Sequence, residues 1–244
     1  MREDQDAIGR GFLDILNGKP DAGIVIDRDD DRSETGMNCR VYFADYEDWP
    51  DLHQKAVEYV RGRVLDVGCG AGRHSLYLQR KGHDVVGIDD SPLAIQVCKA
   101  RGLKDARVLK FSQIGPSLGV FDTILMLGNN FGLFASAVRA KRLLKRLYRM
   151  TSNDARIVAE SRDPYQTTNP IHLAYHERNR ARGRMGGQIR MRARYAGCTT
   201  PWFDYLLASR DEMKSLLEGT GWGVAEFIEQ GDELYVAVIE RADS

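Results

Sequence analysis

The sequence lacks the features that mark several classes of protein. It has only four cysteines, with neither a C-x-x-C pair nor a zinc-like spacing, which favours reduced thiols in a cytoplasmic protein. No apolar run approaches membrane-spanning length, and the N-terminus begins no apolar signal segment, so we expect neither a transmembrane anchor nor secretion. The 35 basic and 35 acidic residues cancel, which argues against a protein that binds nucleic acid by bulk charge.

The charge is balanced overall but unevenly distributed. Residues 1–51 hold fourteen acids and six bases, whereas residues 170–200 hold seven arginines and one acid. Around residues 189–195, apolar residues alternate with Arg190, Arg192 and Arg194, which predicts a strand with one apolar face and one arginine face. These arginines, the arginine strand, could bind a substrate carboxylate or phosphate. Pairing with the acidic N-terminal block is the favoured interpretation, because it accounts for both clusters.

The middle of the chain alternates short apolar runs with helical periods, and 244 residues fit one α/β domain with extra segments. Repeated β-α units predict a parallel sheet that is covered on both faces. The predicted strands are Arg63–Val67, Asp84–Ile88, Arg107–Phe111, Phe121–Leu127 and Arg156–Glu160, and the predicted helices are Arg73–Lys81, Pro92–Arg101 and Ser136–Met150.

The C-terminal tail differs from this pattern. Ser209 and Glu212 form a capping-box sequence before a short helix. The apolar runs Val224–Ile228 and Leu234–Ile239 follow, and the connection between them is so short that the two strands must be antiparallel. We therefore expect an α/β, three-layer, Rossmann-like fold whose mostly parallel sheet ends in a C-terminal antiparallel hairpin.

Two segments lie outside the predicted core. Residues 1–62 form an N-terminal lid or helical segment, in which Asp48 is expected to cap a helix that begins near Pro50. Residues 63–244 form the main domain, with an insertion on the substrate side at about 162–208.

A glycine-rich turn carries the most specific chemical signal. Gly68, Gly70 and Gly72 follow a buried strand and precede a helix, which lets the backbone approach a ligand. A dinucleotide fingerprint would need its third glycine at position 73, which is Arg73, and no Gly-Lys-Ser/Thr follows. Asp66 would repel a pyrophosphate but suits an ammonium or sulfonium ligand.

A second carboxylate supports the same chemistry. Asp89 ends the next strand, 23 residues after Asp66, and an acid at that place accepts hydrogen bonds from ribose hydroxyls. A sugar with free hydroxyls beside a group without phosphate describes an adenosine linked to an amino acid.

This segment resembles motif I of class I S-adenosylmethionine-dependent methyltransferases, and it is close to their small-molecule branch. The resemblance covers roughly residues 60–160 and 205–240, and it implies S-adenosyl-L-methionine as cofactor and S-adenosyl-L-homocysteine as product. It places the glycine turn at the methionine end, Asp66 near the methionine ammonium and Asp89 at the ribose. The remaining cofactor-binding residues that it implies are Arg73, Asp90 beside the adenine, Ser112 in place of an acid that the family often has, and Leu127 and Asn129 after the fourth strand.

The motif after the fourth strand also argues against other methyltransferases. Gly128-Asn-Asn-Phe131 differs from the Asp/Asn-Pro-Pro-Tyr/Phe of adenine-N6 and cytosine-N4 enzymes, and the chain has no Pro-Cys of the C5-pyrimidine type. Two asparagines make a poor magnesium site, so we predict no metal.

Residues for the substrate come from the two extra segments. The resemblance implies that Tyr42 and Tyr46 close over the methionine end or the substrate; in the alternative interpretation, Tyr42, Phe43 and Trp49 are apolar anchors of the entry helix. Asn130 is expected to line the transfer site. Glu160 and Arg162 end the fifth strand and are expected to face the cleft. His172 and His176, four residues apart, are the candidates for a catalytic base.

The sequence therefore predicts methyl transfer to a small-molecule acceptor at an O, N or C atom by in-line displacement, with no nucleic-acid or membrane partner. One alternative is an RNA methyltransferase that uses the basic helix 139–149 and the arginine strand at 190–194. Another is a cofactor-binding protein without catalysis.

Overall fold

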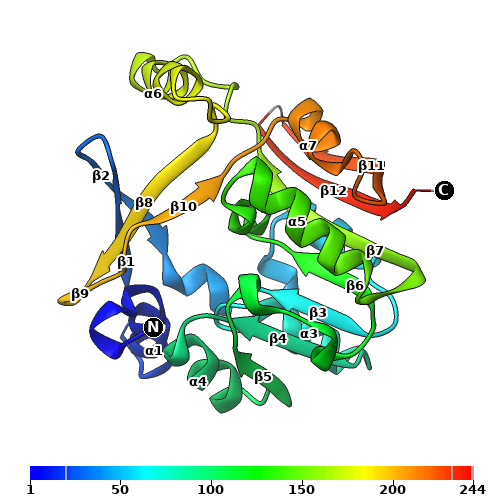
Figure 1. Ribbon diagram of the computed structural model, residues 1–244. Coiled ribbons are helices and arrows are strands. Elements are labelled where there is room, and N and C mark those ends of the chain that lie inside the picture. Colours follow the sequence, from blue (N-terminus) through cyan, green and yellow to red (C-terminus); the bar gives the residue numbers. More distant parts are fainter. Residues whose placement is uncertain (20, 232, 243–244) are drawn as a thin grey trace. The chain divides into compact units, whose positions relative to one another are not determined.

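The computed structural model describes residues 1–19, 21–231 and 233–242. The chain divides into two compact units, and Figure 1 labels many of the helices and strands. Unit 1 comprises Met1–Trp49, Leu65–Ile114 and Arg190–Phe203, and unit 2 comprises Pro50–Val64, Gly115–Ile189 and the chain from Asp204 onward. The predicted division at residues 62 and 63 stays a prediction.

Unit 1 contains three strands that are neighbours in the order β3-β4-β5. Strands β4 and β5 are parallel. Strand β5 is shorter than predicted because Phe111 lies in a 3₁₀ turn, which buries its ring after the strand has ended. The elements are β3 (Val64–Val67), α3 (Arg73–Arg80), β4 (Val85–Asp89), α4 (Pro92–Ala100), β5 (Asp105–Val108) and the turn η4 (Phe111–Gln113).

The N-terminal part of unit 1 contains an antiparallel hairpin in addition to helix α1, and its role as a lid or helical segment stays a prediction. Strand β1 pairs with β2 on one side and with β8, the predicted arginine strand, on the other. Ile24 and Ala193 turn toward α1 and pack with Phe12. The run of β-branched residues Ile24-Val25-Ile26 is the sequence signal of β1. The elements are η1 (Glu3–Gln5), α1 (Ala7–Leu16), β1 (Gly23–Arg28), β2 (Arg32–Asn38), η2 (Cys39–Phe43), η3 (Tyr46–Asp48), β8 (Gln188–Tyr195) and β9 (Cys198–Thr199).

Four of the strands described in unit 2 are neighbours in the order β11-β12-β7-β6. Strands β6 and β7 are parallel, and β12 is antiparallel to both β7 and β11, as the C-terminal hairpin prediction requires. The predicted capping box of Ser209 and Glu212 is present at α7. Helices α5 and α7 contact each other. The elements are β6 (Phe121–Met126), α5 (Ala137–Tyr148), β7 (Thr151–Arg162), β10 (Phe203–Leu206), α7 (Arg210–Leu217), β11 (Trp222–Gln230) and β12 (Leu234–Arg241).

The entry helix of unit 2 is α2 (Asp51–Glu58), and Pro50 occupies its N-cap position without a side-chain hydrogen bond. The prediction that Asp48 caps this helix is wrong, because Asp48 lies in the turn η3, which closes before the helix begins. The other elements of unit 2 are η5 (Pro116–Leu118), η6 (Asn130–Phe134) and α6 (Pro170–Ala181).

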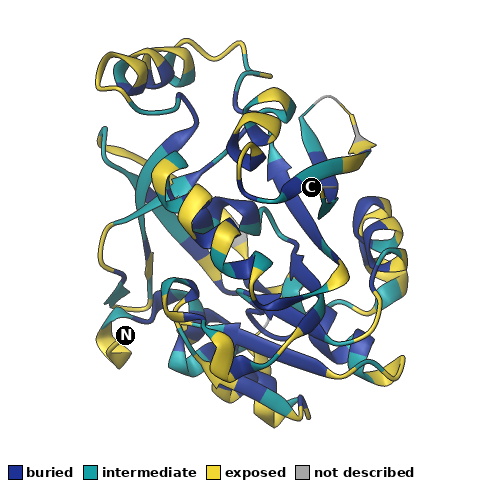
Figure 2. Ribbon diagram, turned by 45° about the vertical axis from the view of Figure 1, so that its right-hand side comes forward, coloured by how far each residue is buried: buried dark blue, intermediate teal, exposed yellow. Residues whose placement is uncertain are grey.

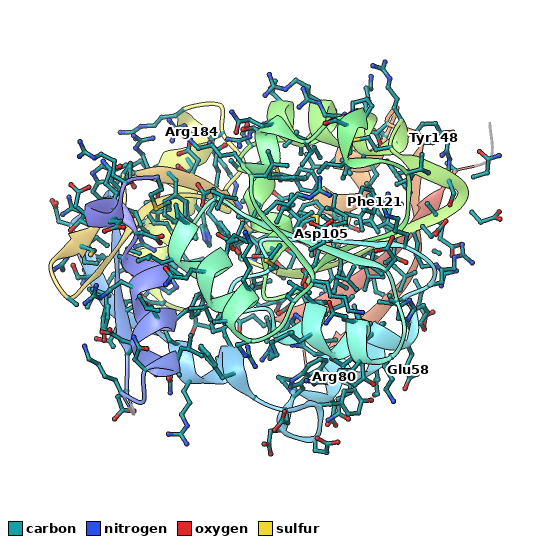
Figure 3. The ribbon with its side chains drawn as sticks, turned by 90° about the horizontal axis from the view of Figure 1, so that it is seen from below. Glu58, Arg80, Asp105, Phe121, Tyr148 and Arg184 are labelled. Carbon is teal, nitrogen blue, oxygen red and sulfur yellow. The ribbon has the colours of Figure 1, made fainter. Side chains whose placement is uncertain are left out.

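Buried residues concentrate in the strands and on one face of most helices (Figure 2). Within unit 2, Phe121 at the start of β6 is fully buried, and the Arg63 guanidinium lies 4.7 Å from the centre of its ring (Figure 3). Within the described ranges, no helix is both long enough and apolar enough to cross a membrane.

Candidate functional site

The first predicted carboxylate, Asp66, lies on β3 in unit 1. Only 2 % of Asp66 is exposed, and its Oδ2 accepts a hydrogen bond of 2.6 Å from the Ser75 hydroxyl on α3. Burial raises the pKa of Asp66 to about 6, against the opposing effects of Ser75 and of the Arg73 guanidinium. Asp66 is therefore a buried acceptor whose negative charge is incompletely compensated.

The glycine turn after β3 lies against the N-terminal segment. Gly70 has a φ of +55°, a conformation that L side chains rarely adopt. A Cβ at Gly70 would also lie 3.4 Å from the Phe12 ring and 3.8 Å from Tyr42. The N-terminal segment thus approaches the turn closely, and glycine supplies the backbone freedom that the turn needs.

The second predicted carboxylate, Asp89, contacts this turn directly. Its Oδ2 accepts a hydrogen bond from the Gly70 amide (3.1 Å), and its Oδ1 accepts one from the Ser91 amide (2.9 Å). The Gly68 amide donates to the carbonyl of Ile88 (2.8 Å). The structure therefore brings the ends of β3 and β4, with their acids and glycines, to one place.

The charge of Asp89 is poorly compensated in this environment. Burial and the neighbouring Asp90 raise its pKa to about 7, although the Ser91 and Gly70 amides oppose this, and Asp6 raises it further. Hydroxyl donors favour the ionised form of a carboxylate. Asp89 therefore has the chemistry that binding of sugar hydroxyls requires.

The other residues of unit 1 that are predicted to bind the cofactor are Arg73, Asp90 and Ser112. Arg73 is buried, and its guanidinium donates a hydrogen bond of 2.9 Å to the carbonyl of Val41, so it holds the N-terminal segment. Asp90 is exposed after β4, and Ser112 is half-buried in η4. Cofactor contacts for Arg73, Asp90 and Ser112 stay predictions.

The two N-terminal tyrosines have different surroundings. The Tyr42 ring lies 5.2 Å from the ring of Phe12 and next to Gly70. Tyr46 stacks on Tyr77 of α3 with 4.6 Å between ring centres, and it also contacts Trp49. These contacts favour a packing role for Tyr46 and Trp49, whereas Tyr42 lies at the glycine turn.

Sequence reasoning missed a buried carboxylate that joins two helix N-termini. Asp6, 1 % exposed, caps α1 by accepting a hydrogen bond from the Gly9 amide (3.0 Å). It also accepts hydrogen bonds from the Ser91 hydroxyl (2.7 Å) and the Leu93 amide (3.0 Å) at the start of α4. Asp6 therefore ties the N-terminal segment to the loop that carries Asp89. The capping position before α1 was the available sequence signal.

The predicted transfer-side residues of unit 2 follow β6. Leu127 is buried, and Gly128 and Asn129 have φ values of +77° and +61°. The Tyr205 hydroxyl donates a hydrogen bond of 2.6 Å to the carbonyl of Asn129. Asn130 begins the turn η6.

Glu160 on β7 contacts this loop from inside unit 2. Its Oε2 accepts a hydrogen bond from the Gly128 amide (2.5 Å) and lies 2.8 Å from Nε2 of His53 on α2. Burial raises the pKa of Glu160, but the opposing effects of His53 and of the Gly128 and Asn129 amides are together larger, so the pKa is lowered. Sequence reasoning missed His53 because a lone histidine on a helix carries no pairing signal.

The remaining substrate-side candidates lie elsewhere in unit 2. Arg162 forms a half-exposed ion pair of 3.0 Å with Glu233. Both predicted histidines lie on α6: His172 is 3.4 Å from the Thr167 hydroxyl, and the buried His176 ring packs edge-on against Tyr165. Glu160 contacts a different histidine, His53. A base role for His172 or His176 stays a prediction.

The arginine strand pairs with the acidic N-terminal block, as the favoured interpretation predicted. Asp27 on β1 accepts hydrogen bonds from Arg194 (2.7 Å) and Arg192 (2.9 Å) on β8. The Arg194 guanidinium, the Ser33 hydroxyl and the Arg192 guanidinium hold the pKa of Asp27 well below its usual range. These two arginines are thus engaged within unit 1.

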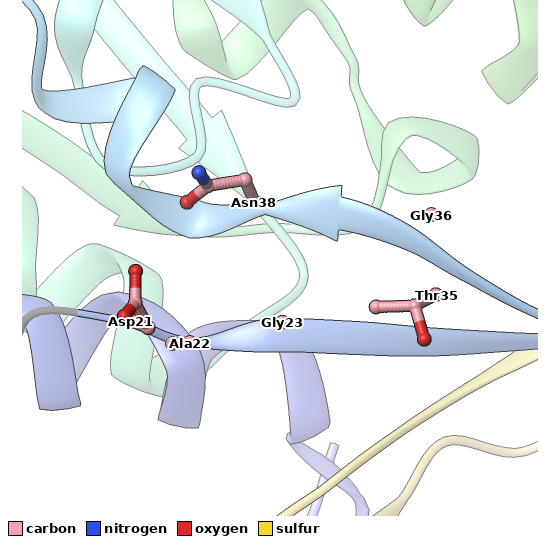
Figure 4. Close-up of a pocket in the computed structure, with 6 residues that line it drawn as sticks. All are labelled: Asp21, Ala22, Gly23, Thr35, Gly36 and Asn38. Atoms are coloured by element: carbon pink, nitrogen blue, oxygen red, sulfur yellow. The ribbon is translucent and has the colours of Figure 1, made fainter.

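A shallow cavity of about 290 Å³ lies on the β1–β2 hairpin (Figure 4). It contains none of the predicted site residues. In the part of the chain that the structure describes, no group of three His, Cys, Asp or Glu residues could hold a metal ion. The cavity is lined by Asp21, Ala22, Gly23, Thr35, Gly36 and Asn38.

Comparisons with known proteins agree with this geometry. The sequence profile described as a methyltransferase domain matches residues 64–154. A 2-heptyl-1-hydroxyquinolin-4(1H)-one methyltransferase of Mycobacteroides abscessus is 42 % identical over 72 residues, 27 % of this chain and 32 % of that protein. A magnesium-protoporphyrin O-methyltransferase of Rhodobacter capsulatus is 39 % identical over 67 residues, 26 % of this chain and 30 % of that protein. The match therefore spans about a third of each curated relative.

A solved structure matches almost the whole chain. It is a SAM-dependent methyltransferase from Bacteroides fragilis in complex with S-adenosyl-L-homocysteine. The TM-score is 0.83 at 25 % identity, and the match covers 99 % of this chain and 97 % of that one. The comparisons confirm the predicted Rossmann-like fold and the resemblance drawn from the glycine turn.

Proposed function

We propose that this chain is a class I Rossmann-like S-adenosylmethionine-dependent methyltransferase and that it transfers a methyl group to a small-molecule acceptor at an O, N or C atom. The observation that carries the proposal is the pair of acids at the ends of β3 and β4, Asp66 buried and Asp89 half-buried, with Asp89 hydrogen-bonded to the glycine turn that follows Asp66. The Bacteroides fragilis structure supports S-adenosyl-L-methionine as the cofactor. The two curated relatives, both named for small-molecule substrates, support that acceptor class.

The residues of unit 1 fit this cofactor chemically. Asp89 accepts hydrogen bonds from the ribose hydroxyls, and these would favour its ionised form, which burial and the neighbouring Asp90 disfavour. Asp66 stabilises the methionine ammonium, and Gly68, Gly70 and Gly72 let the backbone approach the ligand. Asp90 lies beside the adenine, and the Ser112 hydroxyl takes the place of the acid that contacts the adenine amine in the family.

The residues of unit 2 act on the transfer side. Leu127 and Asn129 contact the methionine end, and Asn130 lines the acceptor site. When bound, the cofactor supplies a methyl group already activated on a sulfonium, so alignment and exclusion of water are the main tasks of the protein. His172 and His176 stay the candidates for a base where the acceptor must lose a proton.

The alternative of an RNA methyltransferase is not favoured, because Arg192 and Arg194 of the arginine strand are paired with Asp27. A cytoplasmic location is part of the proposal and rests on the cysteine pattern.

The test is a methyl-transfer screen with labelled S-adenosylmethionine against metabolite pools and, in parallel, total RNA. Label entering small molecules supports the proposal, and label entering only RNA at low salt supports the alternative. Binding of S-adenosyl-L-homocysteine, measured by calorimetry, separates both from a protein that does not bind the cofactor.

A further inference from the structure

The loop after β6 has an unusual backbone. Gly128 and Asn129 are consecutive residues with positive φ, and asparagine is one of the few residues other than glycine that adopt this conformation at modest cost. Successive backbone N–H groups in such a turn can converge on one anion. In this protein the anion is a side chain of unit 2 itself, the carboxylate of Glu160.

The Glu160 carboxylate is hydrogen-bonded to this loop and to one histidine. It is 4 % exposed, it accepts a hydrogen bond of 2.5 Å from the Gly128 amide, and the Asn129 amide also lowers its pKa. His53 is 6 % exposed and lies 2.8 Å away. Because an ionised carboxylate only accepts hydrogen bonds, Nε2 of His53 is the donor in this contact.

The backbone carbonyl of Asn129 is also hydrogen-bonded. The Tyr205 hydroxyl donates a hydrogen bond of 2.6 Å to it. The Tyr205 ring lies so close to Gly132 that a Cβ on Gly132 would be 2.2 Å from the ring. Oδ1 of Asn129 is buried and has no hydrogen-bond partner within the described ranges. A buried acceptor without a partner is costly unless a donor reaches it.

We propose that Glu160 and His53 are positioning residues that hold Gly128 and Asn129 in the left-handed conformation and so aim Oδ1 of Asn129 at an N–H or ammonium donor of the ligand. Glu160 thereby acts through the loop and does not itself contact the substrate. The link from the loop to the cofactor rests on the proposed function, whereas the anchoring of the loop does not.

The anchoring is tested by amide hydrogen exchange of Gly128 and Asn129 in the ligand-free protein. Glu160→Gln keeps the side-chain shape but removes the charge, and we expect exchange at both amides to accelerate about tenfold, as loss of a charge-assisted hydrogen bond implies. The matched control is Glu226→Gln, because Glu226 is exposed and accepts a hydrogen bond of 2.7 Å from Tyr59, in the same 50–64 segment as His53. Unchanged exchange in Glu160→Gln overturns the proposal.

A second pair of variants separates positioning from folding. His53→Gln can still present a donor to Glu160, whereas His53→Ala cannot, so we expect slow exchange to be retained in the first and lost in the second. Equal behaviour of the two variants overturns the role of His53. This comparison also covers the case in which Glu160→Gln fails to fold.

The link to the ligand is tested by calorimetry with S-adenosyl-L-homocysteine. We expect Glu160→Gln to weaken binding about tenfold while Glu226→Gln binds like wild type. Faster exchange with unchanged affinity overturns the link. Absence of binding by wild type counts against the proposed function alone, since the exchange results are independent of the ligand.

Discussion

Two carboxylates, the half-buried Asp89 of unit 1 and the buried Glu160 of unit 2, differ in the direction of their pKa shift. Asp89 of unit 1 has its pKa raised to about 7 by burial and by the neighbouring acids Asp90 and Asp6. Glu160 of unit 2 has its pKa lowered, because His53 and two backbone amides outweigh the effect of burial. Both groups accept backbone hydrogen bonds, so the difference lies in their charged neighbours.

The direction of the pKa shift distinguishes carboxylates suited to binding a ligand from carboxylates that stabilise the folded protein. A carboxylate with a raised pKa gains when donors from a ligand reach it, whereas one with a lowered pKa is already satisfied inside the protein. Asp89 belongs to the first kind and Glu160 to the second. The position of an acid at the end of a strand is the same in both cases and does not distinguish them.

The largest effect is expected for Asp6, a buried carboxylate of unit 1 that holds the N-termini of two helices together. Asp6→Ala removes the acceptor shared by Gly9, Ser91 and Leu93, and we expect it to lower the free energy of unfolding by about 3 kcal/mol. Urea denaturation measures this, with the exposed Asp4→Ala as control. Equal stability of the two variants would show that Asp6 does not tie the helices together.

The next effect concerns ligand binding at Asp89. Asp89→Asn should weaken binding of S-adenosyl-L-homocysteine by roughly 1–3 kcal/mol, because a charged acceptor of hydroxyl groups is lost. Asp105→Asn, on the adjacent strand β5 and paired with Arg107, is the matched control. Calorimetry on both variants measures the change, and unaltered affinity in Asp89→Asn would remove this residue from the ribose role.

The raised pKa of Asp89 predicts a pH dependence of the same binding. Ribose hydroxyls need the ionised carboxylate, and with a pKa of about 7 most of the group is protonated at pH 6. We expect affinity for S-adenosyl-L-homocysteine to rise about tenfold between pH 6 and pH 8. Titrations at the two pH values measure this, and the slope should disappear in Asp89→Asn. A flat profile in wild type would contradict the assignment.

In the ligand-free protein, the same pKa acts on stability with the opposite sign. The folded pKa of about 7 lies above the ordinary value of 3.8, so between these values the folded state binds more protons than the unfolded state. The contribution of Asp89 to stability therefore decreases as pH rises from about 4 to 7. Asp89→Asn removes this loss, so its Tm at pH 8 minus its Tm at pH 5 should be higher than the same quantity in wild type. An equal value in the two proteins would contradict the prediction.

The smallest effect is expected for the ion pairs of the arginine strand. Asp27→Asn removes the charge that Arg192 and Arg194 share, and because the two guanidinium groups are partly exposed we expect a stability loss of about 1 kcal/mol. Thermal unfolding measures the loss. Affinity for S-adenosyl-L-homocysteine should stay at the wild-type value, and a change in it would show that the strand takes part in ligand binding.

Much of the cofactor half was predictable from sequence because its signals are local. The strand end at Asp66, the positive-φ glycines and the cap at Ser91 lie within about 30 residues, and each carries its own residue preference. The role of Asp48 was mispredicted because its local sequence suits either a helix cap before Pro50 or a turn. In the structure Asp48 lies in the turn η3, where Tyr46 packs against Trp49.

The sequence by itself determined the β-α alternation, the glycine turn between two acids, the C-terminal hairpin and the cofactor class, since periodicity and backbone preferences act over a few residues. Only the tertiary structure decided that His53 meets Glu160, 107 residues away, that Asp6 caps two helices, and that β1 joins the arginine strand. Such contacts depend on which chain segments burial brings together, and a single polar residue in the sequence does not specify its distant partner.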